Sequence, residues 1–200
     1  MTTVTVLAYG AGNTASVQFA LERLGATVRL TADPAEVAKA ERLILPGVGA
    51  AGYAMQRLSV LNLIEPIRAF PRPLLGICLG QQLLFGRSHE GEGVDLLGLI
   101  PGQVRAIEPA PGRTVPHMGW SRLARTRDDP LTDGIEDGAY AYFVHGFVCP
   151  DGPATVSTAD YGGVVPAVVR SGNRWGCQFH PERSAEAGAR ILKNFLELSA

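Results

Sequence analysis

Cys78 lies in a short turn between a strand-like and a helix-like run, where a nucleophile is expected. Leu74 and Leu75 lead into Gly76-Ile77-Cys78-Leu79-Gly80, and a helix-like run to Phe85 follows. This is the strand–turn–helix context of a nucleophile elbow, with sulfur in place of the usual serine hydroxyl. The glycines permit the sharp bend, and a helix N-terminus favours a thiolate. The pattern favours a nucleophilic Cys78, with the Leu79 amide facing an oxyanion, over a buried inert cysteine.

A thiolate nucleophile needs a base that removes its proton and later protonates the leaving group, and the base needs an orienting group. His180 follows the apolar run 175–179 and precedes Pro181 and Glu182. The ends of parallel strands share one rim of an α/β sheet, so Cys78 and His180 meet if their strands are neighbours. Glu182 would then orient the imidazole and stabilise its cation.

The other three histidines fit structural roles better. His89 lies beside Glu90 in a polar loop and is expected to be solvated, whereas His117 and His145 lie at strand ends and suit hydrogen-bonded structural positions. Cys149 and Cys177 are assigned to packing, because unpaired cysteines are usually small core residues.

The first half of the chain must supply the strands that carry these residues. Strand-like and helix-like runs alternate there with short glycine turns, which indicates a parallel, doubly wound sheet. Asn13 is a plausible cap for the first helix, which Gly25 would end, and Asp33 begins the next helix with proline at the first position. The expected strands are 3–9, 27–30, 42–45 and the run before Cys78, and further helical patterns cover 50–69.

The second half is richer in strands, and we expect them to extend the sheet in antiparallel fashion. These expected strands are 101–107, 114–123, 140–148, 154–158 and 164–170. A further strand, 173–179, ends at His180, and a last helix covers about 185–198. The predicted fold is α/β, a flavodoxin-like three-layer doubly wound mixed sheet with a parallel core. A chain of 200 residues without repeats is expected to form one domain over 1–200.

Composition excludes several classes of function. The 18 basic and 19 acidic residues give a formal charge of −1 without a basic stripe, which argues against nucleic-acid binding. No segment resembles a signal peptide or approaches transmembrane length. Three widely spaced cysteines argue against a disulfide framework and offer no CxxC metal pattern. We therefore expect a cytoplasmic enzyme without a metal site.

One motif points to a different class of protein. Residues 10–15 fit the permissive dinucleotide fingerprint G-x-G-x-x-G/A, and Asp33 lies near the distance expected of a ribose-binding acid. Asp33 is already explained as a helix cap, and alanine in the third glycine position weakens the match. We interpret 10–15 as a tight strand-to-helix turn and keep a dinucleotide-binding oxidoreductase as the competing hypothesis.

Taken together, the motifs resemble those of the class I (triad) glutamine amidotransferases. More narrowly, they are similar to those of the glutaminase subunits of imidazole glycerol phosphate synthases. The resemblance covers essentially the whole chain. It rests on the runs at 9–13, 45–50, 75–85, 115–120, 142–145, 158–163 and 178–182, which occur in the family's order.

The resemblance implies a reaction and a role for each residue. Cys78 would attack the side-chain amide carbon of glutamine, with His180 as base and then acid and Glu182 holding His180. Ammonia leaves, and water hydrolyses the glutamyl thioester. Besides Leu79, the oxyanion hole would use an amide of the 46–49 loop, at Val48 or Gly49. The residues implied in substrate binding are Gln82, Gly47, His145, Gly146 and Phe147.

The resemblance also implies a partner and no cofactor. Ammonia would pass through a channel to a separate (β/α)₈ cyclase subunit of imidazole glycerol phosphate synthase, which would dock near Asn13 and Arg183. Gly146-Phe147 replaces the usual Ser-Tyr, and Arg183 replaces a common lysine. The alternatives within this interpretation are another triad glutaminase, such as one serving pyridoxal phosphate synthesis, and an interaction domain with a vestigial triad.

Overall fold

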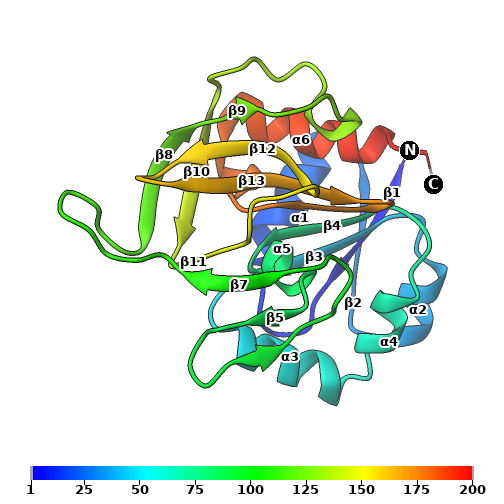
Figure 1. The fold of residues 1–200 in the computed structure, drawn as a ribbon. Helices are drawn as coiled ribbons and strands as arrows, with labels where there is room; N and C mark the ends of the chain where they lie inside the picture. The colour runs from blue at the N-terminus through cyan, green and yellow to red at the C-terminus, as the bar shows by residue number, and fades with distance from the viewer. Residues whose placement is uncertain (1, 200) are drawn as a thin grey trace.

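The computed structural model describes residues 2–199, built around an eight-stranded mixed sheet with helices on both faces (Figure 1). In order across the sheet, the strands are β2 (Thr27–Thr31), β1 (Thr3–Leu7), β3 (Leu43–Gly47), β4 (Leu74–Cys78), β14 (Arg174–Cys177), β13 (Val164–Ser171), β12 (Thr155–Asp160) and β9 (Ala124–Arg125). The first five pair in parallel and the last three antiparallel. The parallel part has the flavodoxin-like order, which confirms the predicted fold class.

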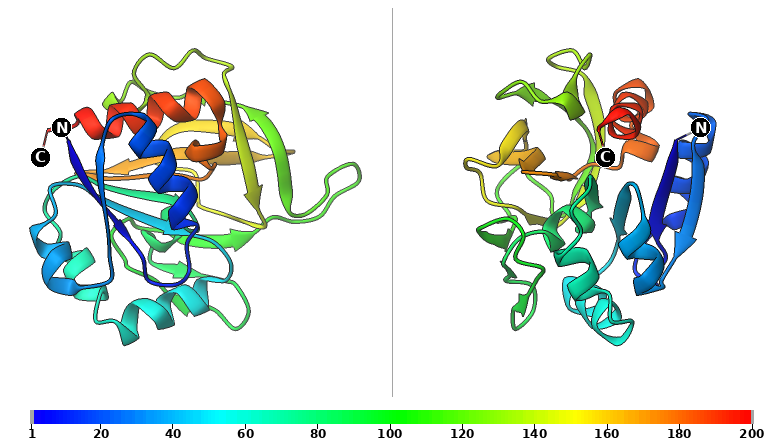
Figure 2. Two further views of the ribbon diagram at one scale, coloured as in Figure 1. Left: turned by 180° about the vertical axis from the view of Figure 1, so that it is seen from behind. Right: turned by 90° about the vertical axis from the view of Figure 1, so that its right-hand side faces the viewer.

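Helices cover the two faces in separate groups (Figure 2). The helices α1 (Thr14–Arg23) and α6 (Ala185–Glu197) pack on one face. The other face carries α2 (Pro34–Lys39), α3 (Ala51–Val60), α4 (Ile64–Arg68) and the short α5 (Leu79–Leu83). The two hydrophobic cores lie between these helices and the sheet, which gives three layers.

The strands feed both cores because successive side chains point to opposite faces of a sheet. In β3, Ile44 belongs to the core under α1 and α6, whereas Leu43 and Leu45 belong to the core under α2 to α5. All three side chains are fully buried. A parallel strand buried on both faces therefore has the continuous apolar sequence that predicted it.

The helix boundaries follow the expected local signals. The side chain of Asn13 accepts a hydrogen bond from the Ser16 amide at the start of α1, and Asp33 accepts one from the Ala35 amide at the start of α2. Gly25 has a φ of +80° just beyond α1, the conformation that a glycine stop supplies. On α6, the apolar stripe is buried at Ile191, Leu192, Phe195 and Leu196.

The strands of the second half do not all join the main sheet. β8 (His117–Arg122) and β10 (Tyr140–His145) form a separate antiparallel pair. β11 (Phe147–Val148), β7 (Gln103–Ala106), β5 (Arg87–Ser88) and β6 (Val94–Asp95) form a small third sheet. The expected strand 140–148 divides at Gly146 into β10, which pairs with β8, and β11, which pairs with β7. The Gly146 carbonyl oxygen accepts a hydrogen bond from the Ile107 amide just after β7. The predicted antiparallel extension therefore holds only for β13 and β12, and β9, which was not among the expected strands, continues it.

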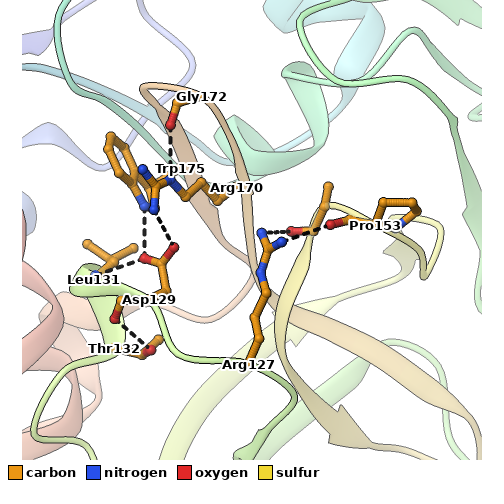
Figure 3. A network of polar contacts seen from close by, with 9 residues as sticks. Arg127, Asp129, Leu131, Thr132, Pro153, Arg170, Gly172 and Trp175 are labelled. Carbon is orange, nitrogen blue, oxygen red and sulfur yellow. Dashed lines mark hydrogen bonds and ion pairs between the residues drawn. The ribbon is translucent and has the colours of Figure 1, made fainter.

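A buried carboxylate ties the second half together (Figure 3). Asp129, just before the 3₁₀ helix η1 (Pro130–Thr132), has a side chain that is 1% exposed. It accepts hydrogen bonds from the Trp175 indole at 3.0 Å and the Leu131 amide at 2.9 Å, and it pairs with Arg170 at 3.1 Å. The Arg170 guanidinium also lies over the Trp175 ring. The charge is thus paired on all sides, as a buried carboxylate requires.

Within residues 2–199, no helix is both long and apolar enough to cross a membrane.

Candidate active site

The elbow at Cys78 has the strained backbone of its type. Cys78 ends β4 with φ +54° and ψ −110°, and α5 begins at Leu79. A Cβ added to Gly76 would lie 2.4 Å from the Gly80 carbonyl oxygen, and one added to Gly80 would lie 1.9 Å from that of Leu45. Both glycines are therefore required by close backbone contact. The helix is shorter than expected, because 3₁₀-type hydrogen bonds from Leu84 and Phe85 end it at Leu83.

The strands that carry Cys78 and His180 are neighbours, as the hypothesis that His180 is the base for Cys78 requires. β4 and β14 pair in parallel, with Gly76 opposite Gly176. The chain leaves β14 and reaches His180, which precedes a 3₁₀ helix, η2 (Pro181–Arg183). The His180 Nδ1 atom lies 2.9 Å from Glu182 Oε1, and the Glu182 side chain is 1% exposed. Nε2 is thus the ring nitrogen left for Cys78.

The environment of His180 favours the imidazolium. Burial lowers the pKa of His180, but hydrogen bonds and charge interactions with Cys78 and Glu182 outweigh burial and raise it from 6.5 to about 10. His180 therefore holds a proton that it can deliver to a leaving group.

The Cys78 sulfur has two polar neighbours besides the imidazole. The thiol donates to the Val144 carbonyl oxygen at 3.7 Å, and the Gln178 side-chain amide donates to the sulfur at 3.8 Å.

Most of the predicted site residues surround one cavity of about 180 Å³. The lining residues are Val48, Gly49, Cys78, Leu79, Gln82, Glu90, Val144, His145, Gly146, Phe147 and His180. Gly47 and Glu182 do not line it: Gly47 pairs with Cys78 at the end of β3, and Glu182 lies behind His180. Three larger hollows formed by residues 2–199 contain none of these residues.

Two lining residues, Glu90 and Val144, were not singled out in the sequence. Glu90 Oε2 accepts a 2.6 Å hydrogen bond from the Ala51 amide at the start of α3, so its carboxylate is held at the cavity. The sequence placed Glu90 in a polar loop, and a contact over 39 residues has no local signal. His89, by contrast, is exposed as expected.

The 46–49 loop packs closely against the elbow. A Cβ at Gly47 would lie 2.7 Å from the Gly80 amide nitrogen and 2.9 Å from Leu79 Cβ. The Val48 amide, one of the two expected oxyanion donors of this loop, donates instead to the Ala11 carbonyl oxygen at 2.8 Å. Gly49 has a φ of +87° and lines the cavity.

Gln82 is buried, and its amide nitrogen is already used. Gln82 Nε2 donates to the Phe147 carbonyl oxygen and to Gln178 Oε1, each at 3.0 Å. Its Oε1 is the atom left to accept a hydrogen bond in the cavity.

His117 and His145 form a buried pair beside the cavity. His117 Nδ1 lies 3.0 Å from His145 Nε2, and His117 Nε2 lies 2.9 Å from Ser121 Oγ. Burial lowers the pKa of His117 to about 4; burial, opposed by a hydrogen bond to Phe147, lowers that of His145 to about 4. Both are hydrogen-bonded structural histidines, as expected, although His145 also lines the cavity.

The glycine turn at 10–15 serves packing. Tyr9 donates its hydroxyl to the Pro46 carbonyl oxygen at 2.9 Å, and a Cβ at Gly12 would lie 2.9 Å from Pro46 Cγ. The turn therefore needs glycine to approach the 46–49 loop, and Asp33 is occupied as the cap of α2. Asn13 is the half-buried cap of α1, and Arg183 is the exposed last residue of η2; neither reaches the cavity.

Within the part of the chain that the structure describes, no three His, Cys, Asp or Glu side chains are grouped to hold a metal ion. Cys149 and Cys177 are buried and free, in agreement with their assignment to packing.

Comparison with known proteins agrees with the site. Residues 5–198 match the family model described as glutamine amidotransferase class-I. The "Imidazole glycerol phosphate synthase subunit HisH" of Xanthomonas axonopodis pv. citri is 54% identical, and the alignment covers 100% of this chain and 99% of that protein. The protein of the same name from Xylella fastidiosa is 52% identical, with both chains fully covered.

Solved structures share the fold. A crystal structure titled as a glutamine amidotransferase superposes with a TM-score of 0.75 at 23% identity, covering 98% of each chain. A chain of PurLQS from Thermotoga maritima superposes with a TM-score of 0.71 at 23% identity, covering 98% of this chain and 99% of that one. At these identities the likeness concerns the fold alone.

Proposed function

The chain belongs to the glutamine amidotransferase class-I family, and on that premise we propose that it is the glutaminase subunit of imidazole glycerol phosphate synthase. It hydrolyses glutamine to glutamate through a cysteinyl thioester and supplies ammonia to a cyclase subunit in histidine biosynthesis. The observation that carries the proposal is the convergence of Cys78, His180 and Glu182 at one cavity edge, in a chain more than half identical to such subunits.

In the proposed mechanism the Cys78 sulfur, once its proton has passed to His180 Nε2, attacks the side-chain amide carbon of glutamine. The C–N bond breaks as His180 returns the proton to the departing nitrogen, which leaves as ammonia. Water then attacks the thioester with His180 as base, which releases glutamate and regenerates the thiol. Glu182 holds Nδ1 and stabilises the imidazolium at each stage.

The oxyanion that forms in both steps needs backbone donors. The Leu79 amide follows the nucleophile in the elbow and is the first donor. The second would come from Val48 or Gly49, and Val48 must first release the Ala11 carbonyl. Loss of one donor typically costs about 3–4 kcal/mol of transition-state stabilisation, so this loop sets the rate.

The amino-acid end of glutamine carries an ammonium and a carboxylate. The Glu90 carboxylate and Gln82 Oε1 line the cavity and are acceptors suited to the ammonium. The backbone around His145, Gly146 and Phe147 forms the facing wall and would bind the rest of this end. We assign Gly47 a supporting role, since its close packing on Gly80 leaves no room for a side chain.

The partner that we propose is a (β/α)₈ cyclase subunit, and β8 offers a surface for it. Met118 and Trp120 are 63% and 51% exposed on one face of β8, while His117 on the opposite face is buried. Exposed large apolar side chains on one strand face are typical of an interaction surface. Val48, 41% exposed beside the cavity, belongs to the same proposed contact region, and Asn13 and Arg183 would lie at its edge.

We further propose that the protein works in the cytoplasm, because its three buried free cysteines suit a reducing compartment and need no disulfide.

The test is glutamate release from glutamine, measured with the cyclase subunit of the same organism present. We expect Cys78→Ala to abolish it, and the exposed-residue variant His89→Gln to retain it. Full activity in Cys78→Ala would overturn the mechanism. Full activation by a pyridoxal phosphate synthase instead of the cyclase would assign the chain to a different triad glutaminase, and a nicotinamide-cofactor titration with a fluorescence change would revive the dinucleotide hypothesis.

A further inference from the structure

We propose that Gln178 and His117 are positioning residues for the glutamine hydrolysis described above, linked to the Cys78 sulfur by a chain of buried hydrogen bonds whose two arms meet at the Phe147 carbonyl oxygen. The inference rests on the proposed function for its kinetic consequences. The hydrogen-bond chain itself is inferred from the geometry alone. It runs through Ser121, His117, His145, the Phe147 carbonyl, Gln82, Gln178 and Cys78.

The Phe147 carbonyl oxygen fixes the direction of every other bond, because a carbonyl can only accept. His145 Nδ1 lies 2.8 Å from it and Gln82 Nε2 lies 3.0 Å from it. Both nitrogens must therefore carry the hydrogen, and both lone pairs of the oxygen are used. The side-chain amide orientation of Gln82 follows from this contact without further assumption.

The histidine arm of the chain then has only one arrangement. With its hydrogen on Nδ1, a neutral His145 offers Nε2 as an acceptor, so His117 must donate from Nδ1 across the 3.0 Å contact. His117 Nε2 is then an acceptor, and the Ser121 hydroxyl donates to it at 2.9 Å. The low pKa values of both histidines agree with neutral rings.

The glutamine arm is settled in the same way. Gln82 Nε2 gives its second hydrogen to the Gln178 side chain at 3.0 Å, so the Gln178 atom at that contact is the oxygen. The Gln178 NH₂ group is therefore the end that faces the Cys78 sulfur, at 3.8 Å. A flipped amide would instead set a carbonyl oxygen against the sulfur and oppose the thiolate.

Packing prevents the chain from rearranging. Gln178 is fully buried, and Gln82, His117 and His145 are each at most 5% exposed. The His117 ring is stacked between Tyr161 and Phe143, with centroid distances of 3.9 and 4.8 Å. Because neither ring nor amide can turn without leaving a buried polar group unpaired, the chain keeps an N–H on the nucleophile through the reaction cycle.

The first test needs no substitution. In ¹⁵N-histidine-labelled protein at neutral pH, the ring nitrogen shifts report which nitrogen carries the hydrogen. We expect neutral Nδ1–H tautomers at both His117 and His145, whereas Nε2–H is the commoner form in water. An Nε2–H tautomer or a charged ring at His145 would overturn the chain, whatever the activity of the protein.

The second test is kinetic, with the cyclase present. We expect Gln178→Met to lower kcat roughly tenfold, about 1.4 kcal/mol, with KM nearly unchanged, because Gln178 contacts the nucleophile and not the substrate. The matched control is Gln81→Met: this neighbouring glutamine is equally buried but donates to the Pro166 carbonyl outside the chain. Equal losses of kcat in the two variants would overturn the proposal.

The histidine arm has its own rescue pair. His117→Phe keeps the ring stack but removes the donor, and His117→Asn restores an amide hydrogen near the position of Nδ1. We expect kcat to fall severalfold in His117→Phe and to recover in His117→Asn, while thermal stability follows the opposite order because only Phe keeps the stack. Equal kcat in both variants and the parent would refute the role. If the parent itself released no glutamate, the proposed function would fail. The tautomer test would still show whether the hydrogen-bond chain exists.

Discussion

The amide of Val48 donates a 2.8 Å hydrogen bond to the carbonyl oxygen of Ala11. This contact joins the loop after β3 to the turn after β1, and it holds one expected oxyanion donor away from the cavity. The same turn supports the loop through the hydroxyl of Tyr9 on the Pro46 carbonyl. The resting conformation thus combines a complete His180–Glu182 pair with an incomplete set of oxyanion donors.

We therefore expect the chain alone to be a weak glutaminase that its cyclase partner activates. One missing oxyanion donor lowers kcat by about 10²–10³, so activation of that order is expected when docking frees the Val48 amide. Glutamate release measured across a cyclase titration checks this. A rate without cyclase equal to the saturated rate would contradict it.

The second prediction concerns the charge on Glu182. Glu182→Gln can still accept from His180 Nδ1 but removes the negative charge, so the pKa of His180 should fall below about 10. Because this pKa is raised above 6.5 in the folded state, protonated His180 stabilises the fold. This contribution to the free energy of unfolding is complete below pH 6.5 and is lost as pH rises through the folded pKa.

In Glu182→Gln both that loss of stability and the alkaline limit of kcat should therefore move to lower pH. Cys78 and His180 are in contact, so the measured limits belong to the pair. Urea unfolding and kcat between neutral pH and pH 10 are the measurements. Glu186→Gln, on the exposed start of α6, is the control. An unchanged profile in Glu182→Gln would show that the carboxylate does not hold the imidazolium.

The residues that carry the chemistry were predictable because their determinants are local. The glycines around Cys78 indicate a sharp turn, and the close packing of neighbouring backbone requires glycine there. Only Pro181 separates His180 from Glu182, so their 2.9 Å contact follows from a short turn. The parallel part of the sheet was also predictable, since each strand is buried on both faces and has a continuous apolar sequence.

What escaped the sequence depends on distant contacts. Gln178 reaches Cys78 over 100 residues and Glu90 reaches Ala51 over 39, and neither position has a local pattern that marks it. The separate β8–β10 pair was missed for a similar reason. Strands in small sheets alternate buried and exposed residues like any half-buried strand, so the pattern does not say which sheet they join.

Acid should destabilise the protein through the histidine pair. His117 and His145 have pKa values of about 4 in the folded state against 6.5 otherwise, so unfolding takes up protons between these values and stability falls as pH falls. The loss is up to about 2 kcal/mol per histidine near pH 5, at 1.36 kcal/mol per pH unit. His117→Phe should show a smaller loss between pH 7.5 and 5 in urea unfolding. Exposed His89→Gln serves as control, and equal pH dependence in the two variants would contradict the assignment.

Asp129 should be a major contributor to stability. Asp129→Ala leaves the Trp175 indole and the Leu131 amide without their acceptor and Arg170 without its partner (Figure 3). Removing one member of a buried pair costs about 3–5 kcal/mol, and we expect a loss in that range in the free energy of unfolding. The neighbouring Asp128 has a side chain that is 97% exposed, so Asp128→Ala should change stability by less than about 0.5 kcal/mol. Similar losses in the two variants would refute the buried network.

The elbow offers the sharpest test of how backbone contact positions the nucleophile. A Cβ at Gly80 would lie 1.9 Å from the Leu45 carbonyl oxygen, so Gly80→Ala must push α5 away from β3 and carry Cys78 with it. We expect a loss of about 3 kcal/mol or more in unfolding free energy, at the upper end for overpacking, and loss of glutamine hydrolysis.

Gly52, in the first turn of α3, is the matched control. A Cβ there would meet nothing within 4 Å, so Gly52→Ala should stabilise the protein by about 0.5–1 kcal/mol and leave hydrolysis intact. Chemical unfolding and glutamate release with the cyclase present measure both effects. If Gly80→Ala retained the parent's kcat, the position of Cys78 would not depend on the contact between α5 and β3.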